Sequence, residues 1–434
     1  MPACWLWGRL ALVVGLPPSN LTKDKMILTQ CAVCAADLGL TLGKKCGRCS
    51  TRYCGAECQK QHWQEGGHDT LCKLIKKAGG AEQYNAKYNY AVAVTVAAEA
   101  CAEDTKGQTC YICTQALHWK TKEGLVRGCA CRGTAGFAHV SCLAEQVKIL
   151  VAKCEAQIVE ASDFDLVLEN WFRWFRCGLC EQEYHGVVKC ALGWACWKTY
   201  LGRPEDDWAR CFAMTELGNG LSAANHHEDA LSVREAELAM HLRLDADADE
   251  DYYSDEDDSE SLLTVQSNLA CSYYHLGRYE ESMRLRREVY LKRLKDFRVY
   301  GEEDRDLLIE ANNLAASLLQ RRSFKVAKHL LRKWIPVARR VLGDSNEITL
   351  QLRRTYGEAL YKNVDATLDD LREAVEALED VGRIARRVFG GAHPTTASVE
   401  CALETSRAML RALWCPRIAV FEEFCEMGGE DESG

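Results

Sequence analysis

The arrangement of cysteine and histidine residues constrains this chain more than any other feature of its sequence. Twenty of the 24 cysteines lie at or before Cys211 in a chain of 434 residues. Many form C-x-x-C pairs interleaved with histidines, which is the spacing of metal ligands rather than of disulfide partners. A chain of this length can build a hydrophobic core without disulfide bonds. The pattern therefore predicts zinc sites in a reducing, intracellular compartment, either the cytoplasm or the nucleus.

The first group of ligands lies between residues 31 and 72. It consists of four pairs, Cys31-x2-Cys34, Cys46-x2-Cys49, Cys54-x3-Cys58 and His68-x3-Cys72. Structural zinc takes four nitrogen or sulfur ligands in a tetrahedron, so eight ligands provide for two ions. The x3 spacing places each of the last two pairs about one helical turn apart, on one face of a helix. With every coordination position filled, this zinc is expected to be structural rather than catalytic.

This run resembles the MYND zinc finger, including the Gln59-Lys60-Gln61-His62-Trp63 stretch that follows Cys58. The resemblance implies two interleaved ligand sets, Cys31, Cys34, Cys54 and Cys58 for one zinc, and Cys46, Cys49, His68 and Cys72 for the other. His62 is the nearest rival ligand, and the family pattern favours His68. MYND fingers usually bind short proline-containing peptides, so the resemblance also implies a client peptide as partner.

The second group of ligands lies between residues 110 and 180. Its pairs are Cys110-x2-Cys113, Cys129-x-Cys131, His139-x2-Cys142 and Cys177-x2-Cys180. Both PHD and RING-CH fingers have this order of ligands. In this chain one residue separates the third and fourth ligands, and seven residues separate the fourth ligand from the histidine. This spacing resembles the RING-CH finger more closely than the PHD finger. That resemblance implies one zinc on Cys110, Cys113, His139 and Cys142, and another on Cys129, Cys131, Cys177 and Cys180, so that the chain would hold four zinc ions. Such a finger is expected to have almost no core of its own and to depend on metal for folding.

RING-CH domains are typically ubiquitin ligases that dock a ubiquitin-charged E2 enzyme. By this resemblance the docking surface would include Ile112, Trp171 and Trp174, although the aromatic cluster around Trp171 also fits buried packing. Three features depart from the family. An apolar period after Cys142 predicts an inserted helix, Glu181 stands where active ligases often carry a basic residue, and the membrane spans of the best-known members are not found here.

The C-terminal half has a repeated helical pattern. Asn268-Leu269-Ala270 recurs 45 residues later as Asn313-Leu314-Ala315, and each copy is followed by an aromatic residue, Tyr279 or Phe324. The period resembles the longer tetratricopeptide repeats of kinesin light chains, whose stacked helix pairs share a core. A solenoid of this kind binds peptides or helices on its concave face. Candidate groove residues are Asn268, Asn312 and Asn313, which could equally be helix-surface residues without a partner.

The predicted fold is mainly α, with two small cross-braced zinc fingers followed by a tetratricopeptide-like solenoid. The order resembles that of algal and other protist proteins combining these three elements. The expected boundaries are an N-terminal extension at 1–30, a MYND-type finger at 31–72, a helical spacer or shared interface at 73–109, a RING-CH-type finger at 110–186, a helical linker and first repeat at 187–244, an acidic disordered linker at 245–260, further repeats at 261–415 and a tail at 416–434.

Composition and motifs narrow the function to protein interaction. The net charge of −9 argues against general nucleic-acid binding. The sequence contains neither a phosphate-binding loop nor a catalytic triad pattern, so we expect no small-molecule substrate. No apolar segment reaches the roughly 20 residues needed to span a bilayer, so we expect no membrane span. We therefore expect a ubiquitin-ligase-like adaptor that brings a charged E2 to a client. The alternative is a non-catalytic scaffold.

Overall fold

A computed structural model describes residues 31–34, 36, 38, 43–157, 164–247, 257–300 and 305–427. The expected N-terminal extension at 1–30 lies outside these residues. The chain divides into two compact units, Met1–Leu276 and Gly277–Gly434, and each is described by itself. Within the described residues, no helix is both long and apolar enough to cross a membrane.

The first finger is built from short elements around a very small core. Strand β1 (Lys44–Lys45) pairs antiparallel with β2 (Arg52–Tyr53), and helices α2 (Ala56–Gln64) and α3 (His68–Lys77) follow. Tyr53, Leu71 and Ile75 are buried together with four of the cysteines. So few apolar residues cannot offset the conformational entropy lost on folding, which makes this finger dependent on its ligand clusters.

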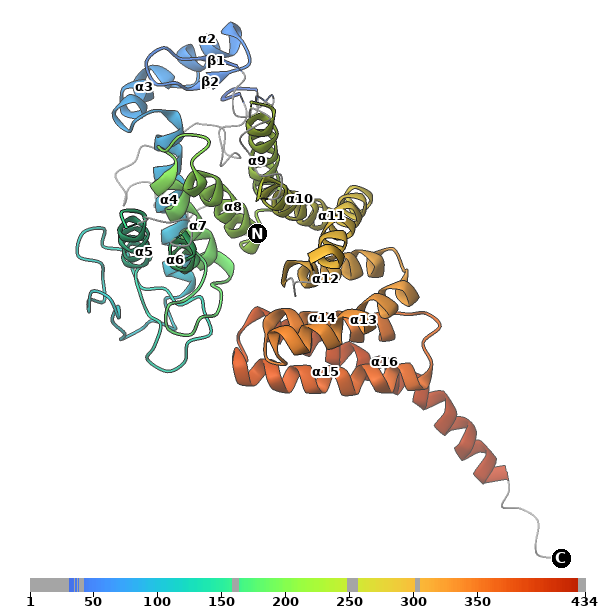
Figure 1. Ribbon diagram of the computed structural model, residues 1–434. Coiled ribbons are helices and arrows are strands. Elements are labelled where there is room, and N and C mark those ends of the chain that lie inside the picture. Colours follow the sequence, from blue (N-terminus) through green and yellow to red (C-terminus); the bar gives the residue numbers. More distant parts are fainter. Residues whose placement is uncertain are drawn as a thin grey trace, which may run out of the picture. The chain divides into compact units, whose positions relative to one another are not determined.

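Helix α4 (Ala81–Ala100) belongs to two hydrophobic cores at once. Its first residues, Ala81 and Tyr84, are buried in the core of the first finger. Further along, Ala86, Val94 and Ala97 are buried in the core of the second finger, where α4 packs against α7 (Figure 1). Of the two alternatives for residues 73–109, the structure favours a shared interface over a spacer.

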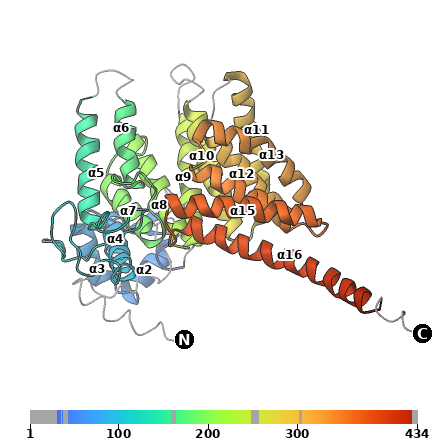
Figure 2. The same cartoon turned by 90° about the horizontal axis from the view of Figure 1, so that it is seen from below.

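The second finger contains the predicted insertion as two helices. Helix α5 (Val140–Glu155) begins inside the ligand pattern, and α6 (Phe164–Trp171) is followed by the 3₁₀ turn η2 (Phe172–Trp174). Helices α5 and α6 pack side by side (Figure 2). Isolated β-bridges join Val126 to Ala138 and Arg176 to Glu183. The other residues of the finger that the structure describes are mostly turns and loops.

The second finger has a larger core than the sequence predicted. Helices α7 (Gly186–Tyr200), α8 (Trp208–Ala223) and α9 (His227–Asp247) share one buried cluster with the finger, its ligands Cys110, Cys142 and Cys177 included. The expectation of almost no core is therefore wrong, because helices that follow the ligand pattern in sequence supply the apolar surface. Helix α7 was expected in a linker and instead lies inside this core.

Helices α7 and α8 approach closely through a pair of glycines. A Cβ atom on Gly193 would lie 2.7 Å from the Glu216 carbonyl oxygen of α8. Reciprocally, a Cβ on Gly220 would lie 2.8 Å from the Lys189 carbonyl oxygen of α7. Both contacts are with backbone, which cannot move aside as a flexible side chain can. Only glycine at these positions permits this helix spacing.

Two predicted irregular segments are partly helical. Helix α9 continues to Asp247 and α10 (Asp257–His275) begins inside the expected acidic linker, whose residues 248–256 lie outside the described part. Helix α16 (Pro394–Met427) likewise covers most of the expected tail. The helices therefore reach further into these two segments than the predicted boundaries allow.

The second unit is a succession of packed helix pairs, as the repeat pattern predicted. Its helices are α11 (Tyr279–Tyr300), α12 (Arg305–Gln320), α13 (Phe324–Leu342), α14 (Glu347–Tyr361), α15 (Leu368–Val388) and α16. Each packs on the next, and α14 also contacts α12 and α16. This alternation confirms the mainly α, tetratricopeptide-like fold class.

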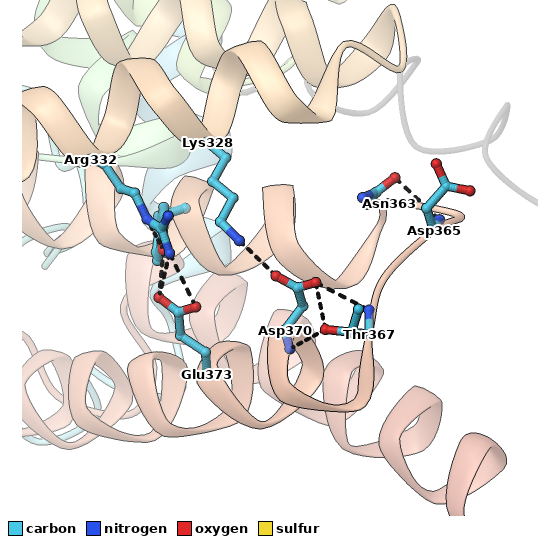
Figure 3. A network of polar contacts seen from close by, with 8 residues as sticks. Lys328, Arg332, Asn363, Asp365, Thr367, Asp370 and Glu373 are labelled. Atoms are coloured by element: carbon cyan, nitrogen blue, oxygen red, sulfur yellow. Dashed lines mark hydrogen bonds and ion pairs between the residues drawn. The ribbon is translucent and has the colours of Figure 1, made fainter.

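Polar contacts join successive pairs across this stack. Lys328 Nζ of α13 lies 2.6 Å from Asp370 Oδ1 at the start of α15. Asp370 also forms a capping box with Thr367, which satisfies backbone N–H groups at the helix start (Figure 3). One turn further along both helices, Arg332 donates to Tyr356 and to Glu373. These contacts fix the register of α13 against α15.

We expect Gly220→Ala to lower the free energy of unfolding by about 1–3 kcal/mol, because the new methyl group must separate α7 from α8. Urea unfolding followed by circular dichroism would measure the change. Gly218→Ala, two residues earlier in α8, is the control, since its Cβ would meet only side-chain atoms at 3.4 Å or more. Equal stability of the two variants would contradict the close approach.

Candidate metal centres

The first cluster of the N-terminal finger brings Cys31, Cys34, Cys54 and Cys58 together. All four sulfur atoms lie within 4.8 Å of one another. Cys34 and Cys54 are 3.4 Å apart, and Cys54 and Cys58 are 3.5 Å apart. Cys58 projects from α2, and the other three come from loops that precede it. Four thiols at this spacing match a tetrahedral structural zinc site.

The second cluster of this finger is buried at all four positions. It contains Cys46, Cys49, His68 and Cys72, with all four ligand atoms within 4.8 Å of one another. His68 and Cys72 lie one turn apart on α3, and His68 Nε2 is 3.4 Å from Cys49 Sγ. Helix α3 starts directly after Gly67, whose φ of 70° turns the chain so that His68 points at the thiols.

His62, the rival ligand, belongs to neither cluster. Its Nδ1 lies 3.0 Å from the hydroxyl of Tyr53, and its ring packs 4.9 Å from that of His68. Burial lowers the pKa of His62 to about 4, so the ring is neutral. His62 is therefore a packing residue behind the ligand His68.

The third cluster, in the second finger, contains Cys110, Cys113, His139 and Cys142. His139 Nδ1 lies 3.3 Å from Cys113 Sγ and 3.6 Å from Cys142 Sγ. On the other side of the ring, Nε2 donates to the carbonyl oxygen of Ala116 at 3.4 Å. A carbonyl can only accept, so this contact places the proton on Nε2 and leaves Nδ1 with a lone pair for a metal.

The fourth cluster joins the segments that are furthest apart in sequence. Cys129 and Cys131 meet Cys177 and Cys180, and the Cys131 and Cys177 sulfur atoms are 3.7 Å apart. Gly136, with φ of 84°, passes so close that a Cβ there would lie 2.5 Å from Cys131 Cβ. This cluster closes the loop that contains α5 and α6.

Three of the C-x-x-C pairs use the same backbone turn. In the turns that begin at Cys46, Cys110 and Cys177, the carbonyl of the first cysteine accepts from the N–H four residues further on, at 3.0, 2.8 and 2.9 Å. The residue that donates is left-handed, with φ of 61°, 61° and 58° at Ser50, Thr114 and Glu181. The turn directs both sulfur atoms to one side. Nothing in the residue types marks these left-handed positions, so the sequence did not predict them.

The thiols of a cluster cannot all ionise without a cation. A hydrogen bond from Cys129 lowers the pKa of Cys177 to about 5. Burial, together with the charge on Cys177, raises the pKa of Cys131 to about 12. One thiolate therefore keeps its neighbours protonated, and a divalent cation is what would release those protons. The donor set fits zinc, and with no position left open the metal would be structural.

Glu123 supports the third cluster from outside. Its carboxylate accepts from the backbone N–H of Ser141 at 2.7 Å and from the Ser141 hydroxyl at 2.8 Å. Thr121 donates to the same carboxylate at 3.0 Å. Because Ser141 lies in the first turn of α5, Glu123 caps the helix that begins between the ligands His139 and Cys142. Nothing in the sequence around Glu123 indicated this role.

Helix α4 contacts ligand-bearing segments of both fingers. Its first residue, Ala81, donates its N–H to the carbonyl oxygen of the ligand Cys49 at 3.0 Å. Further along, the Tyr90 hydroxyl lies 2.9 Å from the Ser141 hydroxyl, and Lys198 Nζ of α7 lies 3.4 Å from the centre of the Tyr90 ring. A single helix therefore contacts segments that hold ligands of both the second and the third cluster.

The residues predicted to contact an E2 enzyme differ in their exposure to solvent. Ile112 is half-buried in the turn between Cys110 and Cys113, and its N–H donates to Cys110 Sγ at 3.4 Å. Trp171 and Trp174 are each only 1% exposed, so their assignment to a docking surface is wrong. Trp171 packs against Tyr200, Trp208 and Phe212. The partners that bury it come from α7 and α8, beyond the ligand pattern.

One of the three predicted groove asparagines, Asn312, has its side-chain oxygen bonded inside the helix stack. Asn312 is 9% exposed, and its Oδ1 accepts a hydrogen bond from Thr355 of α14 at 2.8 Å. This contradicts the prediction that its side chain is available to a ligand in the groove. The carbonyl oxygen of Asn313 accepts from Arg286 of α11. Asn268 is half-buried on α10. Bonding between stacked helices thus occupies the Asn312 amide, while the role of Asn268 stays a prediction.

Comparisons with known proteins agree with two of the three predicted modules. Residues 31–72 match the family model described as MYND finger, the range predicted from the ligand spacing. Residues 262–294 match a model described as tetratricopeptide repeat. The chain is thus a zinc-finger and repeat protein of the protein-interaction type. No protein with curated annotation matches it.

Solved structures with similarity to this chain include kinesin-light-chain repeats. Two are TPR-like repeats of a putative kinesin light chain from Podosopora anserina, one of them a variant with a single substitution. Both are 18% identical over 57% of this chain and 97% of that chain, with TM-scores of 0.33 for the variant and 0.32 for the other. BtubC from P. vanneervenii is 16% identical over 68% of this chain and 94% of its own, with a TM-score of 0.33.

Glu123→Ala removes the cap of α5, and we expect it to cost about 1–2 kcal/mol of stability. It should also speed the transfer of zinc from the second finger to a chelator, because His139 and Cys142 flank the freed helix start. Thermal melting and a chelator assay would measure the two effects. The control is Glu145→Ala on the same helix, which removes only an exposed pair with Lys148. Equal rates for both variants would show that Glu123 does not support the site.

Proposed function

We propose that this chain is a zinc-stabilised adaptor whose second finger docks a ubiquitin-charged E2 enzyme. The MYND finger and the helical repeats would recruit the client. One observation carries the E2 assignment: the first ligand turn of the second finger presents Tyr111 and Ile112 at the surface between two closed ligand sets. Tyr111 is 37% exposed and Ile112 half-buried.

The ligand clusters support binding rather than chemistry at the metal. Each cluster supplies four protein ligands, so no position is open for water or substrate. A ligase of the RING type needs no such position. It orients the E2 thioester for attack by an amine, so a rigid surface is sufficient.

A second candidate, a scaffold without ubiquitin transfer, is favoured by one specific observation. The two tryptophans that would enlarge an E2 surface are buried. What is exposed near the last ligand pair is Leu179, at 53%. In this case all three modules would only bring proteins together.

Reconstituted ubiquitination with a panel of E2 enzymes separates the two candidates. We expect Ile112→Asp to abolish chain formation, because a charge in the docking turn is costly to desolvate against the E2, while the zinc content stays unchanged. His139→Ala should abolish activity by removing a ligand.

Leu179→Asp is the matched control for this assay. Leu179 holds the same place in the turn after Cys177 as Ile112 does after Cys110, and its N–H likewise donates to the first sulfur. It should retain activity. If the unmodified, zinc-loaded protein forms no ubiquitin chains with any E2 in the panel, the result would favour the scaffold.

A further inference from the structure

A groove between α15 and α16 is rich in arginine. It has a volume of about 550 Å³ and is lined by Arg383, Arg386, Arg387 and Arg407, together with Glu379 and Glu400. Four guanidinium groups against two carboxylates give this lining a net charge of +2. The whole chain has a net charge of −9, so the groove is opposite in sign to the protein that carries it.

Three of these arginines form an ion pair with a neighbouring carboxylate. Arg407 Nη2 lies 2.6 Å from Glu379 Oε1, and Arg386 Nε lies 2.6 Å from Glu400 Oε1. Arg383 contacts Asp380 at 2.8 Å and is 75% exposed. A guanidinium has five N–H donors in a planar fork. The contacts described for Arg383 and Arg407 use few of these, so donors remain for carboxylates of a ligand.

Helix-end electrostatics do not account for all of these positions. Arg386 and Arg387 lie in the last turn of α15, where a cation is favoured by the helix dipole. Arg383 lies one turn earlier, and Arg407 lies well inside α16. Gly382 also lines the groove, and a Cβ added there would contact Val399 Cγ1 of α16 at 3.6 Å. Arginines of two different helices therefore line the same groove.

From this convergence we propose that the α15–α16 groove binds an acidic peptide segment of a partner protein. From Glu379 to Arg387 the α15 wall is about 12 Å long, which an extended peptide crosses in roughly four residues. The lining glutamates favour a peptide over nucleic acid, because a peptide can place uncharged residues beside Glu379 and Glu400. A phosphodiester backbone cannot avoid them, since it carries a charge at every nucleotide.

Fluorescence anisotropy with the full chain tests this proposal. The probe is a labelled peptide in which four glutamates alternate with serines, and the reference peptide has glutamines in place of the glutamates. We expect the glutamate peptide alone to bind, and to bind more weakly as sodium chloride is raised from about 50 to about 300 mM, because salt screens exposed charges. Failure of the glutamate peptide to bind, or equal binding of the glutamine peptide, would overturn the proposal.

Variants locate the site. Arg383→Ala with Arg407→Ala should weaken binding about tenfold or more. Arg339→Ala is the control, since Arg339 is 47% exposed, as Arg407 is, and forms its ion pair with Asp344, which does not line the groove. It should change affinity less than about twofold. Equal loss in Arg339→Ala would place binding elsewhere, and equal competition by a single-stranded RNA of the same charge would show a general polyanion surface. Circular dichroism melting checks that the variants fold.

Discussion

The structure of the N-terminal half depends on the convergence of four side chains at each of four points. Every cluster joins segments that are distant in sequence, up to Cys129 and Cys180. Outside helices α2, α3, α5 and α6, the described residues of the two fingers are mostly loops, with one two-residue strand pair, a 3₁₀ turn and isolated bridges. Loops of this kind have few ladder hydrogen bonds to hold them. The ligand clusters would therefore fix these loops, with a bound cation relieving the repulsion among their thiolates.

Helix α4 makes the two fingers parts of one body. Its start is buried with the ligands of the first finger and its end with those of the second. The contacts of Ala81 with Cys49 and of Tyr90 with Ser141 each adjoin a ligand cluster. A partner bound to one finger would thus meet a surface whose orientation relative to the other finger is set. This arrangement suits an adaptor, because binding surfaces held in fixed orientation need less ordering when partners assemble.

Spacing in the sequence was sufficient to group the ligands, whereas burial was not visible there. The interleaved sets follow from resemblance to known fingers, and the structure groups the same residues. Trp171 could not be assigned correctly, because helices outside the ligand pattern cover it. Asn312 likewise resembles a groove residue until its bond to Thr355 is seen. Periodicity shows which face of a helix is apolar or polar, but it does not show which neighbour covers that face.

The most direct test of the account is the zinc content and coordination of the purified chain, by native mass spectrometry and zinc K-edge X-ray absorption. Fourteen cysteines and two histidines in four clusters predict four ions per chain. The mean coordination should then be about 3.5 sulfur and about 0.5 nitrogen atoms per zinc, with sulfur at roughly 2.3 Å and nitrogen at roughly 2.0 Å. Two ions per chain, or oxygen in the coordination shell, would contradict four closed structural sites.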